Sequence, residues 1–392
     1  PDGSRMIMSK SNNNHMWYGL LSTYTNQISK SLELSAGIDV RYYIGEHNNE
    51  IIDLYDGKYF IDDSSRANVK PEQNAAAADP NWVYEKLQVG DKVYRDYDGH
   101  VHQEGVFAQL EWTKKNLNAF VSGSVSNTGY WRYDRYYDAA HAESEHVNFI
   151  GYTVKGGANY NINEKHNVFA NLGYISRAPF FSGGAFLQST TSNVKNPDPL
   201  NEKVFSAEIG YGFRSGILSV NLNGYYTLWM DKSVVRSSSM ANGDYARVNL
   251  SGVDARHMGL ELDFVLRPNR WLDVTGMLSL GDWQWDSDSK GYIYDTQGQP
   301  LTKALDGTVA SGIMAEDHAW LNLKQKGIKV GGSAQTTGAL GVTVRPMKGL
   351  RVSADWNAYG NNYADFYIGS NTSLNGNSTV DVKDPWKIPL GH

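Results

Sequence analysis

The chain of 392 residues contains no cysteine and no run of eighteen apolar residues. The lack of cysteine is compatible with an exported protein that needs no disulfide bonds. Without a long apolar run, the sequence excludes α-helices that cross a membrane. Lys and Arg number 36 and Asp and Glu 42, with a net charge of -6 and no basic stripe. This balance disfavours a nucleic-acid partner.

The chain also lacks a signal peptide, because residues 1–4 directly precede a strand-like segment. If the protein is exported, we expect its native N-terminus to lie upstream of residue 1.

Apolar and polar residues alternate over long stretches of the chain. Residues 218–231 place Leu218, Val220 and Leu222 on one parity and Asn221 and Asn223 on the other. Residues 32–43 and 350–359 repeat the pattern. Successive side chains of a strand point to opposite faces, so each segment predicts a strand with one apolar and one polar face. The alternation alone does not separate a soluble sheet from a barrel wall.

The connections between the predicted strands sort by length. Short polar turns alternate along the chain with much longer connections, as in transmembrane β-barrels, which have tight periplasmic turns and large outer loops. The short turns centre near Ser31, Lys115, Glu164, Ser215, Asn269 and Lys348. The long outer loops are expected at about residues 45–100, 178–202, 284–327 and 361–389.

The predicted strands are too long for an ordinary soluble sheet. Most run for about ten to fifteen residues, whereas soluble strands cluster near five or six and a membrane crossing needs about nine to eleven. The 25 Tyr and 11 Trp residues suit the aromatic girdles of a barrel. We therefore predict an all-β fold, a transmembrane antiparallel β-barrel wall of about twelve strands. The strands should centre near residues 20, 38, 108, 122, 154, 170, 208, 224, 260, 277, 338 and 355.

Several segments resemble a known family when taken together and in order. Residues 171–180 end a strand with Arg177, Ala178 and Pro179, and residues 201–212, 223–232 and 259–262 follow. These segments resemble the barrel of TonB-dependent outer-membrane receptors. Residues 330–337 and 362–366 are similar to the receptors of Bacteroidetes. The resemblance covers about residues 16–389.

The resemblance implies a fragment of a larger molecule. Members of the family have an N-terminal plug domain inside a barrel of about 22 strands, so residues 1–392 are expected to form one partial barrel domain. This domain would be the C-terminal half of the barrel, without the plug domain and the last strands. The implied partners are outer-membrane lipid, the TonB complex through the missing N-terminal part, and a surface lipoprotein.

The implied function is TonB-energised uptake of a bulky nutrient, such as an iron chelate, cobalamin, a glycan or a peptide. A passive porin-like pore, or a non-transporting surface barrel such as an adhesin, is the alternative.

Aromatic and arginine side chains at strand ends are the candidate ligand contacts. Aromatic platforms with arginine forks suit sugars, aromatic chelates and peptides. The same residues also suit an interfacial girdle, which we weigh above ligand contact. The candidates are Tyr130, Trp131, Arg132, Tyr133, Arg177, Phe180, Phe181, Trp283 and Trp285.

Other chemistry finds little support in the sequence. His100 and His102 share one strand face, but no third metal ligand lies nearby. Ser251, Asp254 and His257 lie close together in the chain without a nucleophile-elbow motif. We therefore expect no metal, no cofactor and no enzymatic activity.

Overall fold

The protein is almost entirely β-sheet in a computed structural model that describes residues 2–69, 72–187, 193–239, 245–294, 320–366, 378–383 and 385–389. The helical segments of these residues are α1 (Asp63–Arg66) and two 3₁₀ turns, Ala75–Ala77 and Trp82–Tyr84. None of the described helices has the length and apolarity of a membrane span. The long strands are β1 (Met8–Ser29), β2 (Leu32–Asp53), β3 (Lys92–Lys114), β4 (Leu117–Asp134), β5 (Val147–Asn161), β6 (His166–Arg177), β7 (Glu202–Arg214), β8 (Leu218–Ser239), β9 (Tyr245–Asn269), β10 (Leu272–Trp285), β13 (Ala334–Met347) and β14 (Leu350–Tyr363). The shorter strands are β11 (Ser289–Tyr294), β12 (Trp320–Lys324), β15 (Ser378–Asp381) and β16 (Lys387–Ile388).

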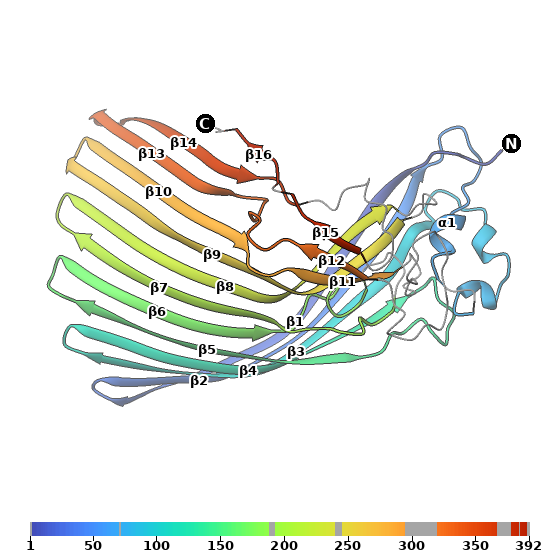
Figure 1. The fold of residues 1–392 in the computed structure, drawn as a ribbon, viewed down its shortest axis with the longest axis horizontal. Helices are drawn as coiled ribbons and strands as arrows, with labels where there is room; N and C mark the ends of the chain where they lie inside the picture. The colour runs from blue at the N-terminus through green and yellow to red at the C-terminus, as the bar shows by residue number, and fades with distance from the viewer. Residues whose placement is uncertain are drawn as a thin grey trace.

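The long strands form one antiparallel meander in which each strand pairs with the next long strand along the chain. β10 pairs directly with β13, whereas β11, which follows β10 in the chain, pairs with β9 and with β12. Figure 1 shows the tight turns together at one end of the sheet and the loops with α1 at the other end. The predicted antiparallel architecture and the twelve strand centres are confirmed.

The tight turns are closed by polar and left-handed residues. The side-chain Oδ1 of Asn269 accepts hydrogen bonds from the backbone N–H groups of Trp271 and Leu272, both at 3.0 Å. Lys115 (φ 51°) and Gly349 (φ 85°) adopt the left-handed conformation that tight hairpins require. These local interactions fix the register with which each hairpin begins.

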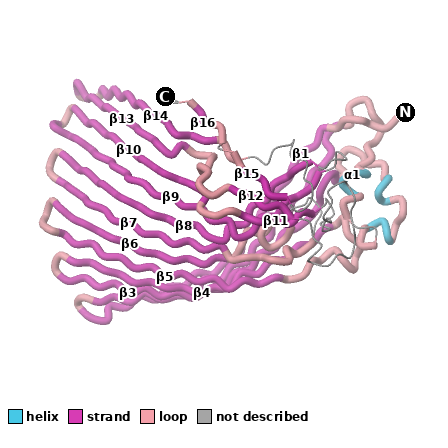
Figure 2. Tube along the Cα trace, in the orientation of Figure 1, coloured by secondary structure: helices cyan, strands magenta, loops and turns pink. Residues whose placement is uncertain are grey.

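Strand pairing continues beyond the positions at which the sequence predicted loops to begin. β2 and β3 remain paired as far as Glu50 and Lys92, so their connection covers residues 54–91 and not 45–100. β11 and β12 occupy parts of segment 284–327, and β15 and β16 lie within 361–389. Residues 295–319, 367–377 and 384 of these two segments lie outside the described residues. Figure 2 shows strands reaching far into the loop end of the sheet.

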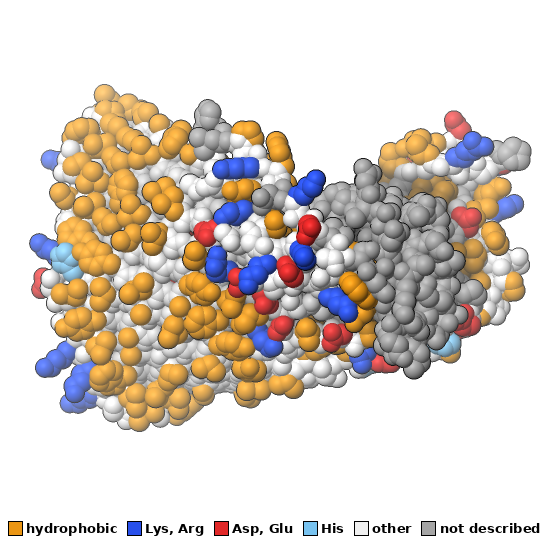
Figure 3. Space-filling view, in the orientation of Figure 1, with side chains coloured by type: hydrophobic (Ala, Val, Ile, Leu, Met, Phe, Trp, Pro, Cys, Tyr) orange, Lys and Arg blue, Asp and Glu red, His pale blue; other side chains and the backbone are white. Residues whose placement is uncertain are grey.

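One face of the sheet carries a continuous apolar band. Its exposed side chains come from neighbouring strands in register, because Ala170 pairs with Ile209, Ile209 with Gly224, and Gly224 with Leu260. Figure 3 shows hydrophobic side chains over the half of this face that lies nearer the tight turns, and charged side chains nearer the loops. The band includes Val106, Val125, Val154, Leu172, Ile209, Leu222, Leu260, Leu280, Val352 and Trp356. The predicted parity of Leu222, Val352 and Trp356 is that of the lipid-facing band.

The other face is polar and concave. Asn171 donates a hydrogen bond to Glu208 at 3.3 Å, and Asn221 donates one to Asp263 at 2.9 Å. A hollow of about 540 Å³ on this wall is lined by side chains that include Lys155, Ser206 and Thr227. This face has the character of a barrel lumen.

Apolar side chains are buried within the chain mainly at the loop end. Val248, Leu250, Ile293, Leu321 and Leu323 are at most 1% exposed and belong to one cluster, where β9, β11 and β12 come together. In the meander itself, the apolar face meets lipid instead of a second layer. The small clusters therefore hold the loops against the strand ends.

The described residues leave the sheet open along two edges. β1 pairs with β2, and β14 pairs with β13 and, at Asn362 and Tyr363, with β16. Unpaired backbone groups at a sheet edge are unfavourable within hydrocarbon.

A charge introduced into the middle of the apolar band should destabilise the inserted barrel. We expect Ile209→Lys to cost about 2–4 kcal/mol in the membrane-inserted protein, because the ammonium group would lie near the bilayer midplane. Ser206→Lys, on the same strand and facing the 540 Å³ hollow, is the matched control and should cost much less. Urea unfolding in lipid vesicles measures both, and equal costs would show that the two faces are assigned wrongly.

Candidate ligand-binding surface

Strand parity divides the candidate residues at the end of β4 between the two faces. Trp131 and Tyr133 share the parity of the exposed Val121 and Val125, which belong to the apolar band. Tyr130 and Arg132 point to the concave face instead. The four residues therefore do not form one ligand platform.

Tyr130 anchors the loop that follows β6. Its hydroxyl donates a hydrogen bond to the carbonyl oxygen of Pro179 at 3.0 Å, and its ring meets Phe181 edge-on at 5.4 Å. Phe186 and Ala185, both 0% exposed, complete this cluster. Tyr130 and Phe181 thus hold residues 178–187 against the wall, and Phe180 beside them remains 52% exposed.

Arg132 lies in a buried ion pair with Asp134. Their side chains are 1% and 0% exposed, with 3.3 Å between Nη2 and Oδ2. The guanidinium carbon lies 4.2 Å from the ring centroid of Tyr97, and Asp134 accepts a hydrogen bond from the backbone N–H of Tyr136 at 3.0 Å. Burial raises the pKa of Asp134 to about 6, although the charge of Arg132 opposes the shift. Arg132 is therefore buried in an ion pair in this structure and is not exposed on the candidate surface.

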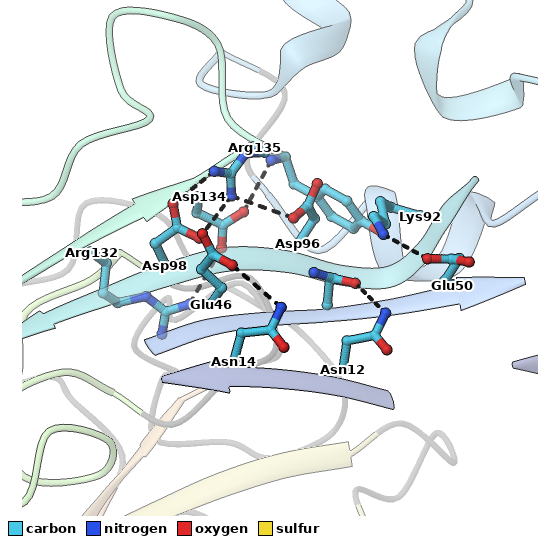
Figure 4. Close-up of polar contacts among 12 residues, drawn as sticks. Asn12, Asn14, Glu46, Glu50, Lys92, Asp96, Asp98, Arg132, Asp134 and Arg135 are labelled. Carbon is cyan, nitrogen blue, oxygen red and sulfur yellow. Dashed lines mark hydrogen bonds and ion pairs between the residues drawn. The ribbon is translucent and has the colours of Figure 1, made fainter. Parts of the chain in front are cut away.

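Arg135, the next residue after Asp134, forms a second group of ion pairs nearer the surface. Its guanidinium binds Asp98 at 2.7 Å and Asp96 at 3.4 Å, and the arginine side chain is 43% exposed (Figure 4). In the following loop, burial raises the pKa of Tyr137 to about 12 and also raises that of Tyr136. Both hydroxyls thus remain protonated.

The outward-facing Trp131 lies between two histidines. The rings of His100 and His146 stack on it with centroids at 3.5 Å and 5.1 Å. His100 also forms a hydrogen bond with the hydroxyl of Tyr42 at 2.8 Å. The described residues contain no group of three or more His, Asp or Glu side chains that could hold a metal ion.

Arg177 belongs to a cationic and aromatic cluster on the concave face. Its Nε and Nη2 donate to one oxygen of Glu202, at 3.1 Å and 2.5 Å, and Glu202 is 0% exposed. The guanidinium carbon lies 4.7 Å from the ring centroid of Phe180 and 5.3 Å from that of Trp229. The Nζ atom of Lys232 lies 3.4 Å from the Trp229 centroid.

Three members of this cluster, Glu202, Trp229 and Lys232, were not predicted as site residues. The segments that contain them, 201–203 and 229–232, stood out only through the family resemblance. Glu202 could have been found as an acidic residue that lies opposite Arg177 in the pairing of β6 with β7.

The two tryptophans at the end of β10 differ in accessibility. Trp283 donates a hydrogen bond from Nε1 to the hydroxyl of Tyr225 at 2.9 Å, and its ring lies 5.5 Å from that of His257. The amide of Gln335 bonds both the backbone N–H and the carbonyl of Trp283 at 3.0 Å, which fixes its position. Trp285 is 5% exposed and packs edge-on against Phe366, so it belongs to the core of the loop end.

Removing the charge of Arg132 should loosen the loop end of β4. We expect Arg132→Met to cost about 3–5 kcal/mol, because Asp134 would be left buried without its counter-ion. Arg135→Met is the matched control, and its partly exposed pairs should be worth about 0–1 kcal/mol. Hydrogen exchange of residues 130–146 in the membrane-inserted protein reports both changes, and Arg132→Met with Asp134→Asn should restore protection. If Arg132→Met and Arg135→Met changed hydrogen exchange to the same extent, the result would contradict a buried Arg132–Asp134 pair.

Comparison with known proteins places the chain in a family. Residues 4–389 match the model described as TonB dependent receptor-like, beta-barrel. A comparison with curated proteins gave no match.

Solved structures with a similar fold include one transporter and two receptors. The copper transporter OprC is 13% identical, with 92% of this chain and 53% of that one covered and a TM-score of 0.55. The ferric yersiniabactin uptake receptor FyuA from Yersinia pestis is 12% identical, with 95% and 46% covered and a TM-score of 0.53. The ferric preacinetobactin receptor BauA from Acinetobacter baumannii is 12% identical, with 94% and 46% covered and a TM-score of 0.53.

At these identities the structural similarities show the fold alone, and the chain spans about half the length of the solved structures it matches. The family model, in contrast, matches nearly the whole chain. The protein therefore belongs to the TonB-dependent receptor β-barrel family, whose barrels lie in the outer membrane.

Proposed function

We propose that the protein works in TonB-energised uptake of a bulky nutrient across the outer membrane. The observation that carries this proposal is the match of residues 4–389 to the receptor barrel family. The separation of tight turns from long connections supports it, because capture of a large ligand needs a broad loop surface above the membrane. Iron chelates, cobalamin, glycans and peptides remain the candidate nutrients.

The structural neighbours favour a metal-containing cargo. One is a copper transporter, and two others are receptors for ferric yersiniabactin and ferric preacinetobactin. One of these proteins is named as a transporter and two as receptors, and none is named as an enzyme. We accordingly propose transport, and not an enzymatic reaction, for this chain.

We further propose that residues 1–392 act as part of a larger barrel of about 22 strands with a plug domain. Two observations support this. The chain spans about half of its solved neighbours, and the edges of β1 and β14 would be left unpaired in lipid. In that arrangement the TonB complex would act on a part of the receptor other than this wall. A surface lipoprotein partner and a Bacteroidetes origin stay predictions.

Deletion of the TonB energy-coupling system should abolish nutrient uptake by the full-length receptor while binding at the cell surface persists. Energised transport needs the coupling to release the cargo into the periplasm, whereas capture depends on the barrel and its loops. Uptake of candidate radiolabelled nutrients in matched strains, with and without the coupling system, makes the measurement. Unchanged uptake would favour the passive-pore alternative, and surface adhesion without uptake of any nutrient would favour the adhesin.

A further inference from the structure

We propose that the concave wall between β6 and β9 contains a subsite for a ligand that carries a carboxylate beside a flat ring. Lys232 and Arg177 would bind the carboxylate, and Trp229 and Phe180 would contact the ring. The assignment rests on the proposed function in one respect, since a transported ligand passes along this wall.

A β-bulge places Lys232 on the concave face. Strict alternation along β8 would put Lys232 with Leu222 and Leu228, on the lipid side. The pairing with β9 shifts register between Trp229 and Lys232, where Asp231 adopts a positive φ of 56°. As a result, the Lys232 ammonium lies over the ring of Trp229, at 3.4 Å. Bulges that re-aim a side chain in this way are concentrated near functional sites.

The Lys232 ammonium has no carboxylate within ion-pair distance among the described residues. Its contact with Trp229 is a cation–π interaction, which compensates only part of the lost hydration of a partly buried charge. Arg177 is the neighbouring cation, and Glu202 is the neighbouring carboxylate. Both hydrogen bonds of Glu202 go to Arg177. Two cations thus face one carboxylate, and an incoming anion would restore the balance.

The hydrogen-bonding groups of the cluster are incompletely used. Glu202 bonds Arg177 through Oε2 alone, and its buried Oε1 has no hydrogen-bond partner among the described residues. The indole N–H of Trp229 is likewise buried and unpartnered. Buried polar groups in native structures are usually satisfied, so the free indole N–H, which is a donor, indicates a missing acceptor. The Glu202 Oε1 atom is itself an acceptor, and a carboxylate ligand would not satisfy it. A carboxylate can accept from the indole N–H and from both cations.

The aromatic part of the ligand has both a surface and a space. Phe180 is 52% exposed beneath the Arg177 guanidinium. The 540 Å³ hollow is lined by Val204, which pairs in register with Trp229, and by Thr227, two residues before Trp229 in β8. An aromatic ring in the hollow could contact Trp229 in the offset or edge-on geometry that ring pairs prefer. The combination of cations with flat apolar faces favours an aryl carboxylate over a simple anion.

Benzoate, benzamide and acetate are probes that separate these contributions. We would measure their affinities for the purified full-length receptor by saturation-transfer NMR. Benzoate should bind at least about tenfold more tightly than neutral benzamide or ring-free acetate. Lys232→Gln should weaken benzoate about tenfold, whereas Lys232→Arg should retain binding. Phe180→Leu and Trp229→Leu should each reduce the preference for benzoate over acetate.

Lys203→Gln is the matched control. Lys203 follows Glu202 directly in β7 but pairs with Asp231 at 2.6 Å on the opposite face, so its loss should leave benzoate affinity unchanged. No benzoate signal, equal binding of benzamide, or an unchanged affinity in Lys232→Gln would overturn the subsite. An equal loss in Lys203→Gln would overturn it too, since the effect would then be a general one of charge.

The same variants separate this inference from the proposed function. If benzoate binds as expected but uptake does not require the TonB system, the subsite stands and energised transport fails. If uptake requires the TonB system but Lys232→Gln leaves benzoate affinity unchanged, transport stands and the subsite fails.

Discussion

The hydrogen bonding of the backbone is the constraint on which the rest of this structure depends. Within hydrocarbon no water can satisfy a free N–H or C=O group, so every strand must pair along its length with neighbours on both sides. Pairing successive strands gives the antiparallel meander seen here. It also forces side chains to alternate between lipid and lumen, which explains why the chain is rich in polar residues and yet belongs in a membrane.

The constraint weakens where the strands leave the membrane, and other interactions take over there. Water can satisfy the backbone, so loops and short strands become possible, and small apolar clusters and buried ion pairs hold them in place. Arg132 illustrates the change. Its sequence position at an aromatic strand end suggests a ligand contact, but a loop covers it and makes it a structural cation for Asp134.

The wall was predictable from the sequence, whereas much of the candidate site was not. Alternation and turn residues depend on local chemistry, so they located every long strand. The alternation of side chains along the strand would also have shown that Trp131 and Arg132 lie on opposite faces of the sheet. By contrast, the burial of Glu202, the covering of Trp285 by Phe366 and the extension of β2 and β3 beyond the predicted loop boundaries result from contacts between distant segments. No single-strand pattern contains that information.

Lys232 shows how a binding group can enter a wall whose faces are otherwise set by alternation. A bulge reverses the parity of the residues after it, but it removes a backbone N–H from the regular ladder. Here the released N–H of Asp231 donates to the side-chain Oδ1 of Asp254 at 2.9 Å, and the Asp231 carboxylate binds Lys203. The local cost of the bulge is therefore offset on the outer side of the sheet. The concave side gains the Lys232 ammonium over the ring of Trp229. Strict alternation would have sent Lys232 to the lipid side.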